Sequence, residues 1–204
     1  MSASLSVCVF CGFSPGVGPR YLGAAKDLGA LLGERGHRLV YGAGTGGLMG
    51  AVASGAAGRG GSIVGLIPDF LRVREQADEL PEQRLILTGD LLERKRRMIE
   101  EADAFLALPG GYGTLDEVLE VISMKALGVL SAPLVLVDVD EAWAPFVTLI
   151  ESLHERGFLR DLDVYSVADG PEEALAQVER HAAADRPADR PADRPGHRPA
   201  VLQP

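Results

Sequence analysis

Short apolar runs alternate with amphipathic stretches along almost the whole chain, and this alternation constrains the fold more than any other feature. Seven runs predict strands, at Ser6–Phe10, Arg38–Tyr41, Ser62–Ile67, Leu85–Leu87, Ala104–Leu108, Leu134–Val137 and Val164–Val167. Six stretches with helical periodicity lie among them, at Tyr21–Glu34, Leu48–Ala57, Leu91–Ala102, Leu115–Leu127, Ala142–Glu155 and Pro171–His181. Most runs are continuously apolar, as in strands that are buried on both faces. We therefore predict an α/β fold with an open parallel sheet and helices on both of its faces.

The C-terminal stretch differs in composition from the rest of the chain. It repeats Ala-Asp-Arg-Pro three times between Ala184 and Pro195 and lacks apolar periodicity, so it has nothing to bury. We predict a single folded domain over residues 1–182 and a disordered tail over residues 183–204. A chain of 204 residues is long enough for one domain with a sizeable core.

Charge and composition narrow the classes of partner. The net charge of −9 argues against general nucleic-acid binding, which depends on a basic surface. No apolar run is long enough to span a membrane, and the N-terminus lacks the basic region of a secretory signal. Only Cys8 and Cys11 are present, so we interpret both as core residues and expect a cytoplasmic protein. We expect Trp143 in the core and the histidines, namely His37, His154, His181 and His197, at the surface.

Ligands of open parallel sheets bind beyond the carboxyl ends of the strands, so the turns that follow strands are the places to search. The first candidate is Gly42–Gly47. Glycines let a ligand approach the backbone closely, and the N-terminus of the following helix offers free N–H groups to an anion. Gly42, Gly44 and Gly47 also match the G-x-G-x-x-G dinucleotide pattern, with Asp69 following 22 residues later. The structural alternative is a tight turn with close helix–sheet packing.

A second glycine turn, Pro109–Thr114, also joins a predicted strand to a predicted helix. Two such turns on one sheet indicate a phosphate site more strongly than one does. Neither contains the Gly-Lys-Ser/Thr of a Walker A loop, which argues against a nucleoside triphosphatase and leaves a monophosphate. Thr114 and Glu117 match the Thr-x-x-Glu capping box, so Glu117 is a capping residue, a site carboxylate or both.

The helix predicted at Leu91–Ala102 places a lysine among apolar side chains. At about 100° per residue, its apolar stripe is centred on Lys95, and Arg94 lies at the edge of the stripe. A buried lysine is costly unless its charge is paired. Lys95 could extend its ammonium group to water along an apolar stem. Alternatively, Arg94 and Lys95 point at a buried anionic ligand.

Two segments carry motifs that are specific when they occur together. The first reads Glu93-Arg94-Lys95-Arg96-Arg97-Met98. The second, from Ala104 to Glu117, contains every specified position of the pattern P-G-G-x-G-T-x-x-E. Together with Val7–Gly12 and Val40–Gly50, these segments resemble the LOG family of cytokinin riboside 5′-monophosphate phosphoribohydrolases, often mislabelled as lysine decarboxylases. The resemblance extends from residue 5 to residue 180.

The resemblance implies a Rossmann-like fold, a homodimer, and hydrolysis of a nucleoside 5′-monophosphate to free base and ribose 5-phosphate without a metal or a redox cofactor. It implies that Arg94 and Glu117 form the catalytic pair. The ligand-binding residues expected from the resemblance and from the glycine turns are Gly44, Thr45, Gly46, Glu75, Lys95, Gly110, Gly111, Tyr112, Gly113, Thr114 and Ser123. The chain departs from the family pattern near the expected ligand pocket, at Phe13, Ala43, Leu92 and Met124.

The chemistry expected of these residues is cleavage of an N-glycosidic bond through an oxocarbenium-like transition state. A fixed carboxylate at Glu117 would favour that state and could activate the attacking water. Lys95 would add positive charge beside the phosphate, and Arg94 would bind ribose oxygens or assist departure of the base. Two other hypotheses remain open: a dinucleotide-dependent oxidoreductase, from the glycine pattern, and a nucleotide-binding protein without catalysis, from the departures near the pocket.

Overall fold

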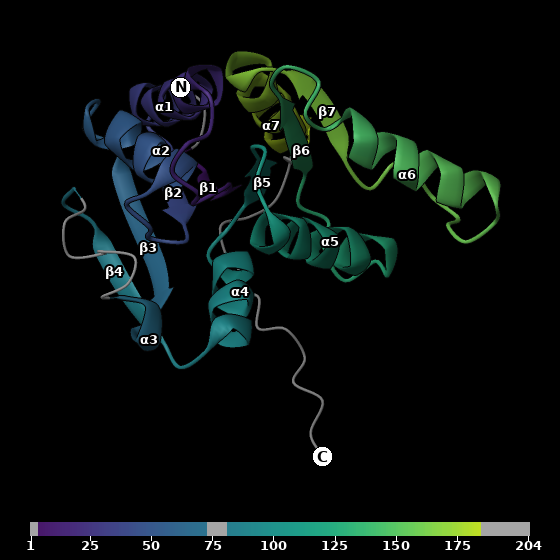
Figure 1. The fold of residues 1–204 in the computed structure, drawn as a ribbon, viewed down its shortest axis with the longest axis horizontal. Helices are drawn as coiled ribbons and strands as arrows, with labels where there is room; N and C mark the ends of the chain where they lie inside the picture. Colours follow the sequence, from purple (N-terminus) through teal and green to yellow (C-terminus); the bar gives the residue numbers. More distant parts are fainter. Residues whose placement is uncertain (1–3, 73–80, 185–204) are drawn as a thin grey trace, which may run out of the picture.

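The strands of the described chain form one parallel sheet (Figure 1). The computed structural model describes residues 4–72 and 81–184. The strands are β1 (Ser6–Phe10), β2 (Arg38–Tyr41), β3 (Ser62–Pro68), β4 (Arg84–Thr88), β5 (Ala104–Ala107), β6 (Leu134–Asp138) and β7 (Ser166–Asp169). Their order is β4-β3-β2-β1-β5-β6-β7, and each neighbouring pair is parallel. The predicted Rossmann-like α/β fold is confirmed.

Helices cover both faces of this sheet, as predicted. They are α1 (Pro19–Glu34), α2 (Gly47–Ala57), α3 (Asp69–Arg72), α4 (Leu91–Glu100), α5 (Tyr112–Ala126), α6 (Ala144–Glu155) and α7 (Pro171–Ala184). Buried residues of α1, α2 and α7 pack on one face, and those of α4 and α5 pack on the other (Figure 1). Among the described residues, no helix combines the length and apolar character needed to cross a membrane.

The predicted strands agree with the structure to within two residues at either end. Three helical features differ from the prediction. Helix α5 begins earlier, at Tyr112, because glycines conceal its first turn from a periodicity argument. Helix α7 continues to Ala184, past the predicted domain end at residue 182, because its last three residues are alanines, the strongest helix formers. Helix α3 was not predicted, since four residues are too short to show a helical period. Residues 183 and 184 of the predicted tail therefore belong to α7, and the rest of that tail, residues 185–204, lies outside the described residues.

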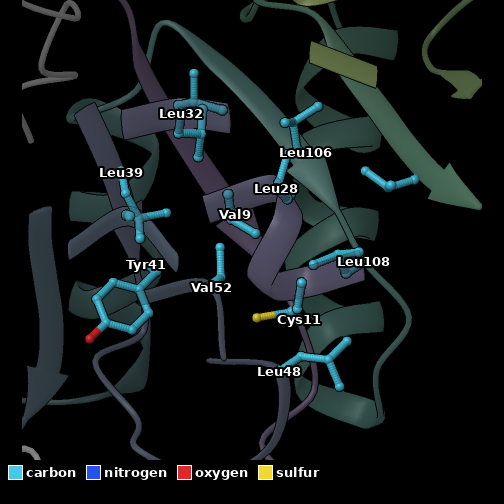
Figure 2. Close-up of a cluster of buried hydrophobic side chains, with 14 of the residues drawn as sticks. Val9, Cys11, Leu28, Leu32, Leu39, Tyr41, Leu48, Val52, Leu106 and Leu108 are labelled. Carbon is cyan, nitrogen blue, oxygen red and sulfur yellow. The ribbon is translucent and has the colours of Figure 1, made fainter. Parts of the chain in front are cut away.

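Two apolar layers hold the helices on the sheet. Figure 2 shows the layer beneath α1 and α2, where Leu28 and Val52 lie beside Val9 of β1. Side chains of β1 alternate between the two layers, so that Cys8 packs in the layer under α4 and α5 while Cys11 packs under α1 and α2. Both thiols are free and buried. The interpretation of the two cysteines as core residues is confirmed.

Helices α1 and α2 touch each other through glycine. A Cβ atom built on Gly29 of α1 would clash with the Val52 carbonyl oxygen, and one built on Gly55 of α2 would clash with the Lys26 carbonyl oxygen. The two backbones therefore meet where no side chain fits. This contact fixes the position of α2, whose N-terminus follows the first glycine turn.

One histidine lies where the sequence did not predict it. The His37 ring is buried, its Nδ1 accepts the Leu5 N–H at 3.2 Å, and its Nε2 lies 3.0 Å from a carboxylate oxygen of Glu179. Glu179 also pairs with Arg35 at 2.7 Å. The expected surface position is wrong for His37, because the backbone near β1 and a carboxylate from α7 supply partners for both ring nitrogens. Trp143 is buried, as predicted.

The strand order places a switch point between β1 and β5. The chain adds β2, β3 and β4 on one side of β1 and then returns to place β5 on its other side. Loops that leave the carboxyl ends of β1 and β5 therefore diverge, which is where open α/β sheets bind their ligands. Both predicted glycine turns lie at this edge, one after β2 and one after β5.

Candidate active site

Gly12, two residues beyond β1, connects the two glycine turns. Its N–H donates to the Pro109 carbonyl at 3.2 Å, and its own carbonyl accepts the Leu48 N–H at 2.9 Å. Pro109 begins the second glycine turn, and Leu48 lies in the first turn of α2. A Cβ atom on Gly12 would lie 3.2 Å from the Cα of Gly110, so the close approach depends on glycine. The three loops are therefore joined at the switch point.

The first glycine turn is covered by the loop that follows β1. A Cβ atom built on Gly44 would lie 2.7 Å from Cδ2 of the Phe13 ring, and one built on Gly46 would lie 2.9 Å from Cε2 of that ring. The backbone carbonyl of Phe13 lies over Gly47 in the same way, at 2.7 Å. The glycines of this turn thus permit the close approach of Phe13.

This arrangement argues against the dinucleotide hypothesis. The G-x-G-x-x-G match follows β2, whereas the fingerprint normally follows the first strand of the fold. Phe13 lies over the glycines that a pyrophosphate would approach. Asp69, the acidic residue of the proposed fingerprint, is exposed at the start of the short helix α3.

Ala43, one of the departures from the family pattern, has an unusual backbone conformation. It is buried with φ of 55°, in the left-handed region that favours glycine. The family pattern has glycine at this position, so the alanine here carries a backbone conformation that its side chain disfavours. The surrounding strands and loops hold the turn in place despite this strain.

The second glycine turn is open at Gly111 and Gly113. Apart from flanking residues and the backbone of α5 itself, no described atom lies within 4 Å of a Cβ atom built on either glycine, and Tyr112 is 94% exposed. Gly111 is the N-cap of α5 and makes no side-chain capping bond. Free N–H groups of the first turn of this helix therefore lie at the carboxyl edge of the sheet, where they can bind an anion.

Glu117 is not a capping residue. Helix α5 begins at Tyr112, so Thr114 lies inside the first turn and Glu117 one turn further on. A capping box would require Thr114 at the N-cap position, which Gly111 occupies. The capping alternative for Glu117 is therefore wrong. Thr114 is buried, and its side chain packs closely against Gly110.

Arg94 of α4 and Glu117 of α5 form a buried pair. Nη2 of Arg94 lies 3.4 Å from Oε1 of Glu117, and the side chains are 12% and 5% exposed. Within the described residues, Nε of Arg94 is buried and makes no hydrogen bond. A Cβ atom on Gly42 would lie 3.6 Å from Nη1 of Arg94, so the pair also borders the first glycine turn. The structure thus brings together the two residues that the resemblance assigned to catalysis.

The charge of Glu117 influences the buried cysteines of the central strand. Burial raises the pKa of both thiols, and the neighbouring carboxylate of Glu117 raises it further. Both effects keep Cys8 and Cys11 in the thiol form, which is not nucleophilic. The two thiols nearest the Glu117 carboxylate are therefore uncharged.

Lys95 is held by two carboxylates of α5. Its Nζ lies 2.9 Å from Oδ2 of Asp116 and 3.2 Å from Oε2 of Glu120, while its stem is buried. Burial alone would lower the pKa of Lys95, but the hydrogen bonds and charges of Asp116 and Glu120 outweigh it, so that the net shift is upward. The predicted contact between Lys95 and phosphate stays a prediction. Adjacent residues of α4 thus pair with adjacent residues of α5: Arg94 with Glu117, and Lys95 with Asp116.

Two carboxylates that were not predicted as site residues fix the start of α4. The carboxylate of Asp90 accepts the N–H of Glu93 at 2.7 Å, and the carboxylate of Glu93 accepts the N–H of Gly89 at 2.8 Å. The signal was present as Asp-x-x-Glu directly before the basic segment. These bonds stabilise the turn of α4 that carries Arg94.

The remaining predicted site residues are more dispersed. Glu75 lies outside the described residues. Ser123 is exposed on α5, six residues beyond Glu117, which places it about 9 Å further along the helix axis. Among the departures, Leu92 is 73% exposed on α4. No group of three or more His, Cys, Asp or Glu side chains in the described part of the chain is arranged to hold a metal ion.

Sequence comparisons identify a family. A family model described as possible lysine decarboxylase matches residues 49–178. A probable cytokinin riboside 5′-monophosphate phosphoribohydrolase, LOG4 of Oryza sativa subsp. japonica, is 40% identical over 181 residues, which cover 87% of this chain and 78% of that protein. The cytokinin riboside 5′-monophosphate phosphoribohydrolase LOG7 of Arabidopsis thaliana is 40% identical over 178 residues, which cover 86% of this chain and 81% of that protein.

Solved structures share the fold at lower identity. The Moco carrier protein of Chlamydomonas reinhardtii has a TM-score of 0.67 and 23% identity, covering 90% of this chain and 100% of that one. A molybdenum cofactor binding protein of Rippkaea orientalis has a TM-score of 0.65 and 20% identity, and the match covers 88% of this chain and 98% of that one. At these identities the likeness concerns the fold alone.

Proposed function

Because this chain belongs to the LOG family of cytokinin riboside 5′-monophosphate phosphoribohydrolases, whose family model is described as possible lysine decarboxylase, we propose that it hydrolyses the N-glycosidic bond of a nucleoside 5′-monophosphate. The products are a free base and ribose 5-phosphate. The observation that carries this proposal is the buried Arg94–Glu117 pair between an open anion-binding turn and the first glycine turn.

The open turn at the N-terminus of α5 is the place for the phosphate. Free N–H groups of Gly111, Tyr112 and Gly113, together with the positive end of a 15-residue helix, suit a doubly charged group. Glu117 lies on the same helix, one turn further along, so a phosphate bound at the start of α5 brings the ribose toward its carboxylate. Binding energy at the phosphate thus positions the sugar for the reaction.

Glu117 acts on the carbon that loses the base. As the glycosidic bond breaks, its electron pair moves into the base, and positive charge develops on the ribose carbon. A carboxylate that is only 5% exposed and held by Arg94 stabilises this charge with little reorganisation. Glu117 can also accept a proton from the water that attacks this carbon. The N–H of Arg94 Nε, which makes no hydrogen bond within the described residues, can bind an oxygen of the ribose or an acceptor atom of the base.

Lysine decarboxylation, the activity in the description of the family model, does not suit this site. That reaction uses pyridoxal phosphate, which forms a Schiff base with a lysine amine. Lys95 is bound to two carboxylates, which favour its charged form. Lys125 donates to the Ala132 carbonyl before β6, at the opposite edge of the sheet, and Lys26 is exposed on α1. None of the three lysines of the chain lies beside an anion-binding turn with a free amine.

The proposal includes a homodimer in the cytoplasm. Apolar side chains of α4 and α5 are exposed, with Leu92 at 73%, Leu91 at 49% and Leu119 at 44%. A second copy of the chain would bury them. The two buried, free thiols suit a reducing compartment. Light scattering during gel filtration at several protein concentrations tests the dimer, and a monomer at all of them would contradict it.

A panel of nucleoside monophosphates tests the reaction. The wild-type protein and Glu117→Gln are incubated with AMP, isopentenyladenosine 5′-monophosphate, GMP and CMP, and chromatography measures free base and ribose 5-phosphate in equal amounts. We expect release from at least one adenine nucleotide by the wild-type protein and far less by Glu117→Gln. Binding of a nucleotide without release would support the non-catalytic hypothesis instead.

A further inference from the structure

Phe13 is placed in the loop that joins both glycine turns, and its ring belongs to neither core layer. The residue before it, Gly12, is bonded to Pro109 and Leu48, so the position of Phe13 at the switch point is fixed through its backbone. Its ring packs against Gly44 and Gly46, and it is only partly buried. An apolar aromatic ring is thus presented at the edge of the sheet where the reactive pair lies.

The order of the surrounding parts suggests what this ring contacts. The open turn of α5 offers N–H groups about one helical turn before Glu117, which pairs with Arg94. Nη1 of Arg94 in turn borders Gly42, and Phe13 covers Gly44 and Gly46 of that same glycine turn. A nucleoside monophosphate has a matching order, because its phosphate and its base extend from different ends of the ribose. With the phosphate at the open turn and the ribose at the pair, the base extends toward the covered turn.

We propose that Phe13 is a specificity-determining residue whose ring stacks on the base of the substrate. The proposal rests on the proposed function for the placement of phosphate and ribose. Stacking on an aromatic ring is favourable for any base because every base has a π face, and larger purines gain more contact than pyrimidines. Phe13 therefore adds affinity for the base and favours purine over pyrimidine nucleotides. The first glycine turn serves as the support that holds this ring in place.

Binding measurements separate the base from the rest of the substrate. AMP and ribose 5-phosphate are titrated calorimetrically into Glu117→Gln protein, with and without Phe13→Leu. We expect Phe13→Leu to weaken AMP binding about tenfold, within the range measured for loss of one stacked base, and to leave ribose 5-phosphate binding unchanged. Phe13→Tyr, which keeps the ring, should bind AMP as Phe13 does. Phe13→Met provides a second non-aromatic variant if the leucine variant melts at a lower temperature.

The outcomes distinguish this inference from the proposed function. Equal weakening of AMP and ribose 5-phosphate, or unchanged AMP binding in both non-aromatic variants, would overturn the role of Phe13. Such a result could occur while the wild-type protein still releases base from AMP, and the proposed function would then stand. Conversely, a wild-type protein that releases no base, but binds AMP in a way that depends on the ring at position 13, would overturn the reaction and support the stacking contact.

Discussion

Nη2 of Arg94 lies 3.4 Å from Oε1 of Glu117, although the two residues belong to helices on either side of β5 in the chain. Helix α4 ends just before this strand, and α5 begins a few residues after it. Both helices pack on the same face of the sheet, so the strand between them sets the distance at which the guanidinium meets the carboxylate. The pair is therefore positioned by the central sheet and not by a mobile loop.

Replacing the carboxylate tests its role directly. Glu117→Gln keeps the shape of the side chain and removes the negative charge from a preorganised, buried position. We expect turnover of the best monophosphate to fall 10²- to 10³-fold, the scale on which a single electrostatic stabiliser acts. The free energy of unfolding should change by about 1 kcal/mol, since Arg94 keeps a polar partner. Glu120→Gln, on the same helix but 46% exposed, is the matched control and should retain turnover within about threefold.

A charge placed at the open turn tests the phosphate site. Gly111 has room for a side chain and a φ of −91°, which any residue can adopt. Gly111→Asp should stabilise α5, because a carboxylate at the N-cap suits the helix dipole, and should also repel phosphate. We expect the KM for AMP to rise at least tenfold above that of Gly111→Asn, which has the same shape without charge. A melting curve checks the stabilisation; equal KM values for the two variants would place the phosphate elsewhere.

The contacts of Lys95 predict that removing its charge lowers the free energy of unfolding at neutral pH. Lys95→Met keeps the apolar stem but removes the ion pairs with Asp116 and Glu120, at a cost of at most about 1 kcal/mol, because both carboxylates are exposed. The pKa of Lys95 is raised, so its stabilisation is complete below about pH 10.4 and is lost as pH rises through the higher pKa of the folded state. The free energies of unfolding of wild-type and Lys95→Met protein should therefore approach each other at high pH, which urea unfolding from pH 7 to pH 11 measures. A rate loss with AMP that is absent with adenosine would show the phosphate contact predicted from the sequence.

The contact between α1 and α2 predicts opposite effects of two similar substitutions. Gly29→Ala introduces a Cβ atom that clashes with the Val52 carbonyl, and should lower the free energy of unfolding by about 2–3 kcal/mol. Gly23→Ala lies on the same helix, with no described atom within 4 Å of the new Cβ, and should raise it by about 0.5–1 kcal/mol. Chemical denaturation of both variants tests the contact, and similar values would contradict it.

The network around His37 predicts that the free energy of unfolding depends on pH in the acidic range. Burial alone would raise the pKa of Glu179, but the hydrogen bond with His37 and the charge of Arg35 outweigh it and hold the pKa below its ordinary value. The stabilisation is therefore complete above about pH 4.3 and is lost as pH falls through the lower pKa of the folded state. We expect Glu179→Gln to lower the free energy of unfolding by about 1 kcal/mol at pH 7, and we expect this difference to shrink as pH falls through the lowered pKa of Glu179. A difference that does not shrink with falling pH would contradict this origin.

The sequence was sufficient to predict the sheet and the burial of Lys95. Continuously apolar runs identified most of the strands, because strands covered on both faces need no alternation. The helical period also placed Lys95 on the buried side of α4, as observed. Its partners on α5 could not be predicted, because they depend on how α4 and α5 lie relative to each other across β5.

The difference between the two glycine turns could not be predicted either. Both turns have similar glycine content, and both precede a helix at the carboxyl edge of the sheet. Whether such a turn is open depends on Phe13, a residue from a third loop. Residues in a loop show no periodic pattern from which the direction of the Phe13 side chain could be predicted. The capping interpretation of Glu117 was wrong for a related reason, since glycines at positions 111 and 113 obscured the true start of α5.

The strand order also determines when the central strand becomes protected during synthesis. Strands β2, β3 and β4 can pair in succession as the chain emerges, but the second edge of β1 waits for β5, where Val7 pairs with Ala104, 97 positions later. Until then, β1 exposes an unpaired apolar edge to other nascent chains. Folding should therefore be slowed by this one distant pairing, and aggregation should be greatest in chains truncated before β5.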